Sequence, residues 1–141
     1  MILLLFVAAF AIAQADDAPA WRLSSKPVRD AVRATVEGQL DAIRAGKFDE
    51  AYRFAASGIQ RQFSPAVFAA MLRRGYPAVV AHRRFELGVV RDDRGGRAQV
   101  VCVVFDAKNA GKAFRYSLVA EEGRWRIAGV VADSAEPDRP L

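Results

Sequence analysis

The spacing of apolar residues changes once along this chain, near Arg84, and this change constrains the fold more than any other feature. Before it, apolar residues recur every three or four positions, as in Val28, Val32 and Val36. That spacing is typical of a helix with one buried face. After it, apolar and polar residues alternate, which is typical of a strand with one buried face. Helices followed by strands predict an α+β domain, in which the helices cover one face of a sheet.

Three helices are expected in the first half of the chain, and sequence signals mark their ends. The first begins after a cap at Ser24 or Ser25, has Pro27 in its first turn and ends at Gly46. A short second helix is expected over residues 48–56.

The third expected helix has the clearest start signal. Ser64 is placed to cap its N-terminus, and Pro65 is placed to be its first residue. Gly75 is expected to end this helix, and Pro77 to prevent its continuation. Together the three helices would supply the apolar layer against which the sheet packs.

Four antiparallel strands joined by short turns are expected in the second half, because turn residues recur at 92–96, 108–111 and 121–123. Alternation divides their apolar residues between two faces. The face toward the helices is expected to hold Phe85, Leu87, Val89, Val100, Cys102, Val104, Phe114, Tyr116, Leu118, Trp125 and Ile127. The opposite, outward face is expected to hold Val101, Val103, Phe105, Val119 and Val130.

An uncharged apolar run from Ile2 to Ala13 precedes the domain, and the small-residue triplet 13–15 and two aspartates follow it. This pattern is typical of a secretory signal peptide, and the run is shorter than the roughly 20 apolar residues that span a membrane. We expect cleavage after Ala15 and a periplasmic or secreted chain without a membrane span. The expected divisions are a signal peptide (1–15), a polar lead (16–24), one domain (25–132) and a disordered tail (133–141).

Three short motifs resemble a family of small exported bacterial proteins that is catalogued as a domain of unknown function. They are Ala-Tyr-x-Phe-Ala-Ala-Ser-x-Ile-Gln at 51–60, Phe-x-x-Met at 68–71 and Gly-Tyr-Pro at 75–77. The order of elements is also similar to the cone-shaped scaffold of nuclear transport factor 2, ketosteroid isomerase and polyketide cyclases. Over residues 28–132, the resemblance implies three helices packed on a curved four-stranded antiparallel meander. It implies no activity.

The residues present do not indicate a cofactor or a metal. The chain has one cysteine, Cys102, among apolar neighbours, and one histidine, His82, which is too few for a typical zinc site. No phosphate-binding loop, dinucleotide fingerprint or nucleophile elbow is found. The net charge of +5 is spread along the chain without interleaved aromatic residues, which does not favour nucleic-acid binding.

Scaffolds of the kind that the chain resembles enclose a pocket between sheet and helices, so the inward side chains bear on function. Their one hydroxyl is that of Tyr116, and they include no carboxylate, whereas isomerase chemistry needs a carboxylate base. The main hypothesis is therefore non-catalytic binding of a small apolar ligand. The polar-tipped residues expected at that pocket are Tyr52, Tyr76, His82, Tyr116 and Trp125.

Two alternatives remain open. In the first, the apolar outward face of the sheet forms a homodimer or binds another protein. In the second, the protein is an isomerase or hydrolase. Its general base would be His82, whose ordinary pKa suits that role, or a carboxylate that the simple alternation hides.

Overall fold

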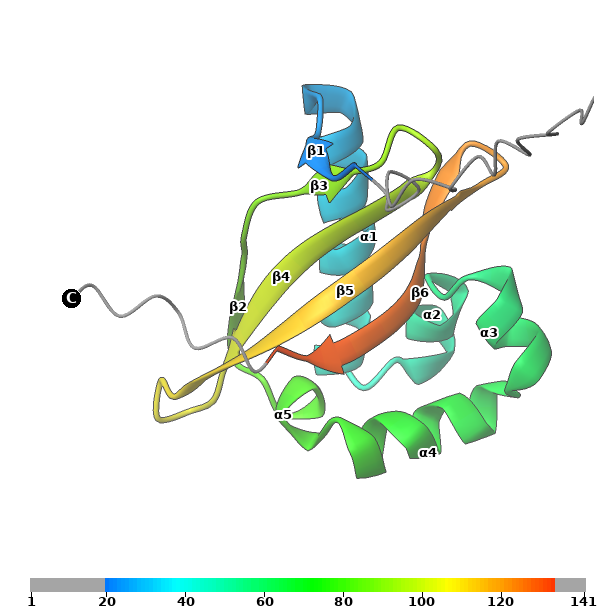
Figure 1. Ribbon diagram of the computed structural model, residues 1–141. Helices are drawn as coiled ribbons and strands as arrows, with labels where there is room; N and C mark the ends of the chain where they lie inside the picture. Colours follow the sequence, from blue (N-terminus) through cyan, green and yellow to red (C-terminus); the bar gives the residue numbers. More distant parts are fainter. Residues whose placement is uncertain (1–19, 134–141) are drawn as a thin grey trace, which may run out of the picture.

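The computed structural model describes residues 20–133, which form an α+β domain (Figure 1). The α+β class predicted from the apolar spacing is thus confirmed. The described residues contain five helices where the sequence predicts three: α1 (Lys26–Arg44), α2 (Phe48–Arg53), α3 (Ser57–Gln62), α4 (Pro65–Gly75) and α5 (Pro77–Val80). They contain six strands where the sequence predicts four: β1 (Arg22–Leu23), β2 (Arg84–Leu87), β3 (Arg91–Asp92), β4 (Arg97–Phe105), β5 (Gly111–Glu121) and β6 (Arg124–Ala132). The strands form one antiparallel sheet.

The long helix α1 lies across one face of this sheet (Figure 1). Its apolar stripe of Val32, Val36 and Leu40 is fully buried, and each such side chain contributes roughly 1.5–3 kcal/mol to folding. The helix ends where the sequence predicts, because Gly46 just beyond it takes a positive φ of 73°. Gly residues adopt this conformation without strain.

A glycine within α1 lets the end of α2 pack closely against it. A Cβ atom placed at Gly38 would lie 2.6 Å from Cζ of Phe54, well inside van der Waals contact. Glycine costs a helix interior about 1 kcal/mol relative to alanine. The close approach of the Phe54 ring explains why the residue is tolerated here.

The second predicted helix ends early and is followed by another, α3. The sequence predicts one helix over residues 48–56, but α2 ends at Arg53, and α3 begins at Ser57. The new helix begins where Glu121 of β5 accepts hydrogen bonds from the backbone N–H of Ser57, at 3.0 and 3.2 Å. A carboxylate from a distant strand therefore performs the capping that the local sequence lacks.

Helix α4 begins as predicted, and the helix after it was not expected. The hydroxyl oxygen of Ser64 accepts a hydrogen bond from the N–H of Val67 at 3.2 Å, and Pro65 is the first residue of the helix. The helix ends at Gly75. Pro77 does stop α4, but it also opens α5, since proline is well suited to the first turn of a helix.

The first predicted strand is broken into β2 and β3, which both pair with β4. Leu87 pairs with Cys102, and Arg91 pairs with Gln99. Three residues therefore separate these positions on the β2–β3 side, whereas two separate them on β4. One extra residue on one side of an antiparallel pair is a β-bulge.

This bulge reverses the alternation of side chains beyond it. Val90 and Asp92 are each 3% exposed and face the core, whereas Val89 is 59% exposed. The prediction that Val89 points inward is therefore wrong. A shift of one residue moves every following side chain to the other face of the sheet.

A second irregularity lies where β6 pairs with β5. Ser117 pairs with Gly129, but the next residue, Leu118, pairs with Ile127. Ala128 is thus the extra residue on β6. As at the first bulge, the alternation reverses on its far side.

The second bulge exchanges the positions of two neighbouring valines. Val130 pairs with Tyr116, which faces the core, and Val131 pairs with Arg115 and is 58% exposed. The prediction that Val130 lies on the outward face is therefore wrong. The other predicted outward residues do lie on the face opposite the core, where they are half-buried: Val101, Val103, Phe105 and Val119.

The two ends of the chain carry the predicted signal peptide and the predicted tail. The signal peptide (1–15) and nearly all of the predicted tail (133–141) lie outside the described residues. Asp133 is described: its N–H donates to the carbonyl of Ala113 at 2.9 Å, and its carboxylate pairs with Arg115 at 3.5 Å. Within residues 20–133, no helix is both long and apolar enough to cross a membrane.

Candidate functional site

A cavity of about 230 Å³ lies between the helices and the inner face of β6. Its apolar wall comes from α1, α3, α4, α5 and β6: Ile43, Ile59, Phe68, Met71, Leu72, Val79, Ile127 and Val130. Phe68 and Val79 are buried, whereas Ile59 and Met71 are half-exposed, so the cavity reaches solvent at α3 and α4. Among the described lining residues there is no aspartate, glutamate, histidine, lysine or arginine.

Tyr116 supplies an unused hydrogen-bond donor at this cavity. It lies at the centre of β5 on the inner face, is 1% exposed and lines the cavity. Its hydroxyl makes no hydrogen bond within residues 20–133, and it is not fully enclosed there, since the one fully buried unpaired side-chain atom of these residues is Nε2 of His82. Burial raises the pKa of Tyr116 far above its usual value, and the nearby Cys102 and Tyr76 act in the same direction. The hydroxyl therefore stays protonated and can donate.

The other polar groups in the wall already donate to the protein. The hydroxyl of Tyr76 donates to the carbonyl of Val130 at 2.5 Å, and its ring is tilted against Phe114 at 6.1 Å between centroids. The side-chain amide of Gln39 donates to the carbonyl of Ala51 at 3.2 Å. Both contacts join helices to one another or to the sheet, so these residues hold the cavity wall in place.

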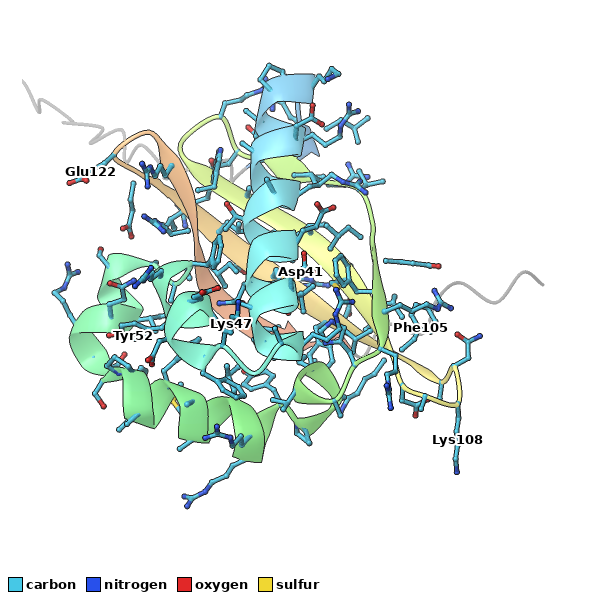
Figure 2. All side chains as sticks on the ribbon, turned by 180° about the vertical axis from the view of Figure 1, so that it is seen from behind. Asp41, Lys47, Tyr52, Phe105, Lys108 and Glu122 are labelled. Carbon is cyan, nitrogen blue, oxygen red and sulfur yellow. The ribbon has the colours of Figure 1, made fainter. Side chains whose placement is uncertain are left out.

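Two of the five predicted pocket residues, Tyr76 and Tyr116, lie in the wall of this cavity, and Tyr52 lies outside it. The Tyr52 hydroxyl is 2.9 and 2.7 Å from the carbonyl oxygens of Gln60 and Phe63, so it fastens α3 to α2. Figure 2 shows Tyr52 among the short helices, on the opposite side of the domain from the outward residue Phe105.

Trp125 also lies away from the cavity. It is half-buried at the start of β6, where its carbonyl accepts a hydrogen bond from the hydroxyl of Thr35 at 3.0 Å. This contact ties α1 to the edge of the sheet. The alternation correctly gives the inward direction of Trp125, but it does not show how far along the sheet the cavity extends.

His82 is buried rather than placed at a rim. It is 2% exposed, its Nδ1 lies 2.6 Å from the carbonyl of Val79, and its ring meets Phe85 edge-on at 5.9 Å. Its Nε2 has no partner within the described part of the chain, and His82 does not line the cavity. Burial lowers the pKa of His82, while Arg44 and Asp41 at the end of α1 act in opposite directions. The ring is therefore neutral, with its proton on Nδ1.

This burial makes the stability of the protein dependent on pH. The unfolded chain protonates His82 near pH 6.5, whereas the folded chain resists protonation. The contribution of the neutral His82 ring to the free energy of unfolding should therefore be complete above pH 6.5. Below pH 6.5, the free energy of unfolding should fall by at most about 1.4 kcal/mol per pH unit. Urea unfolding between pH 7.5 and 5 measures this slope. His82→Asn, whose amide can still donate to the carbonyl of Val79, should show no such slope. An equal slope in the wild type and the variant would show that His82 is not its cause.

The structure does contain a buried carboxylate that the simple alternation does not predict, that of Asp92, but it lies away from the cavity. Asp92, at the end of β3, accepts hydrogen bonds from the hydroxyl of Ser24 and from Arg94, whose Nη1 lies 2.7 Å and whose backbone N lies 3.0 Å away. Burial opposes ionisation of Asp92, but these donors outweigh it and hold its pKa below the usual value. Asp92 does not line the cavity. Gly88, within the strand pattern, is the signal that could have indicated the bulge.

The remaining reactive side chain is Cys102, which lies in the core with no surface exposed. Burial raises the pKa of its thiol to about 12, so it stays protonated and is a poor nucleophile. No group of three or more histidine, cysteine, aspartate or glutamate residues that could hold a metal ion occurs within residues 20–133.

A helical layer on an antiparallel sheet, with an apolar cavity between them, thus defines a small α+β domain. The chain belongs to the family described as domain of unknown function DUF4864, whose model matches residues 25–139. The predicted resemblance to a family of unknown function is confirmed to that extent. The solution structure of a SEC-C motif-containing protein from Rhodopseudomonas palustris is similar, with a TM-score of 0.48 and 12% identity over 74% of this chain and 91% of that one. A search of curated proteins gave no match.

Proposed function

We propose that this domain binds a small apolar molecule in the cavity between α4 and β6. The observation that carries the proposal is a largely apolar cavity of about 230 Å³ whose wall includes Tyr116, with no hydrogen bond made by its hydroxyl within residues 20–133. Apolar cavities of about 150 Å³ hold benzene, so this one suits a single ring with a short substituent. A bound molecule with an accepting oxygen would give this hydroxyl a hydrogen bond, worth about 0.5–1.5 kcal/mol net.

Filling the cavity tests the proposal. Leu72 lines the cavity from α4, and Leu72→Trp should occupy it, whereas Val67 on the same helix is 46% exposed and outside it. Toluene titrated into the labelled protein should shift amide resonances of α4 and β6 in the wild type and in Val67→Trp. The same titration should leave Leu72→Trp unchanged. Absence of any shift in the wild type, with no small molecule retained in native mass spectra, would refute ligand binding.

Self-association through the outward face of the sheet is the second candidate function. Val101, Val103, Phe105 and Val119 lie on this face, and the second bulge adds Val131, which is 58% exposed. The described helices leave this face open (Figure 1). Sedimentation velocity should show a dimer at high protein concentration that Val103→Lys weakens, and a strictly monomeric wild type would exclude it.

The scaffold and the compartment belong to the same proposal. The order of helices before a sheet, with a cavity between them, supports the cone-shaped nuclear-transport-factor-2-like scaffold. The apolar run from Ile2 to Ala13 and the triplet that follows it support export to the periplasm or the medium. Mass spectrometry of the protein from the cell envelope should find a chain that begins at Asp16, and an intact N-terminus would exclude cleavage.

A further inference from the structure

We infer that the ligand is a neutral molecule with an apolar body and one hydrogen-bond-accepting oxygen, which pairs with the hydroxyl of Tyr116. This inference rests on the proposed function and goes beyond it, because it states which chemical class the cavity selects. Two independent features carry it: the unused donor of Tyr116 and the absence of charge from the described part of the cavity wall.

The donor determines the polar group that the ligand must offer. Tyr116 as a residue is 1% exposed, and its hydroxyl makes no hydrogen bond within residues 20–133. Burial keeps the hydroxyl protonated, so it presents a proton rather than a negative charge. Tyr76, the other tyrosine in the wall, already donates to Val130. The complementary group on a ligand is therefore an oxygen with a free lone pair, as in a carbonyl.

The wall also determines the charge of the ligand. A carboxylate or ammonium group in an apolar cavity loses its hydration, and only a charged partner offsets that cost. None of the described lining residues is charged. Arg73 and Arg74 on α4 are exposed and do not line the cavity, and Arg73 lies over the ring of Phe48, 4.4 Å from its centroid. Ionic ligands should therefore be excluded.

Three probes of one shape distinguish these effects. Acetophenone carries an accepting oxygen, α-methylstyrene replaces that oxygen with a CH₂ group, and benzoate carries a charge. Titration by NMR should give a Kd for acetophenone about 10-fold lower than for α-methylstyrene, as expected for one hydrogen bond to a buried donor. Benzoate should bind at least 10-fold more weakly than acetophenone.

Variants at the two tyrosines supply the controls. Tyr116→Phe should lose the preference for acetophenone, because the carbonyl then loses its hydration without gaining a donor, and should bind α-methylstyrene at least as tightly as acetophenone. It should also unfold at about the same temperature as wild type, because the substitution removes no hydrogen bond found within residues 20–133. Tyr76→Phe should unfold at a lower temperature, since it loses the bond to Val130.

The outcomes separate this inference from the proposal on which it rests. Equal binding of acetophenone and α-methylstyrene by the wild type would overturn the role of Tyr116 and leave apolar binding intact. Tighter binding of benzoate would overturn the exclusion of charge. If none of the probes, nor toluene, shifts resonances of α4 and β6, ligand binding itself fails.

Discussion

Replacing Val90 by aspartate is expected to lower the free energy of unfolding by about 4 kcal/mol, or to prevent folding. Val90 is 3% exposed and faces the core beyond the first bulge. The substitution removes its buried apolar surface and places a carboxylate where no partner is provided. Since domains of this size are stable by about 5–15 kcal/mol, this loss removes much of the stability.

The neighbouring valine is the matched control. Val89 is 59% exposed, so Val89→Asp should change the free energy of unfolding by no more than about 0.5 kcal/mol. In both variants a valine becomes an aspartate within the same irregular segment. Urea unfolding followed by circular dichroism measures the difference.

If Val90→Asp does not fold, alanine variants at the same two positions still test the bulge. Val90→Ala should cost about 2 kcal/mol, and Val89→Ala should cost less than about 0.5 kcal/mol. Equal losses at the two positions, or a larger loss at Val89, would show that the alternation continues unbroken and that the bulge is absent.

Replacing Asp92 by alanine should have the second largest effect, a loss of about 3 kcal/mol. The carboxylate joins the N-terminal segment to the turn after β3, because Ser24 and Arg94 both donate to it. Arg94 also donates to the carbonyl of Leu23 at 2.9 Å. Without the carboxylate, Ser24 and Arg94 lose this acceptor, and the backbone pairing of β1 with β3 loses its side-chain support.

The effect of Asp92 should depend on pH in a definite direction. Because the pKa of Asp92 is lowered in the folded state, its contribution is present above about pH 4 and is lost as the pH falls through the lowered value. The difference in free energy of unfolding between wild type and Asp92→Ala should therefore be constant from pH 7 to 5 and shrink below pH 4. A difference independent of pH would show that the carboxylate is not held in its ionised form.

Asp106 provides the control for Asp92. It occupies the turn between β4 and β5, where its carboxylate accepts from the N–H groups of Lys108 and Ala110, both at 2.9 Å. Unlike Asp92, it is exposed. Asp106→Ala should therefore cost less than about 1 kcal/mol. A similar loss in both variants would mean that turn geometry, not burial, explains the effect at Asp92.

The helices that the sequence predicted well are those whose signals are local. In α1, the stripe of Val32, Val36 and Leu40 and the stop at Gly46 lie within one segment, and the start of α4 depends on Ser64 and its near neighbours. Capping and amphipathic spacing act over a few residues, so they can be read directly from the chain. The start of α3 could not be read in this way, because its cap is Glu121, on the far strand β5.

The candidate site was predicted in part. Tyr76 and Tyr116 were expected at a pocket and lie in the cavity wall, whereas Tyr52, His82 and Trp125 lie elsewhere. A side chain with a polar end that points inward can line a cavity, but its inward direction does not by itself place it there. Whether its tip meets a cavity, a carbonyl or the core depends on what the opposing helix places there.

The sequence by itself determined the α+β class, the long first helix, the start of α4 and the strands from Arg97 onward. Each of these follows from spacing and caps within one segment. Only the tertiary structure decided the two bulges, which turn Val90, Asp92 and Val130 toward the core. A bulge is a choice of register between two strands, and one extra residue reverses the faces of all that follow. The cavity is decided in the same way, since it is the space left where the side chains of α4 and β6, far apart in the chain, do not fill the gap between them.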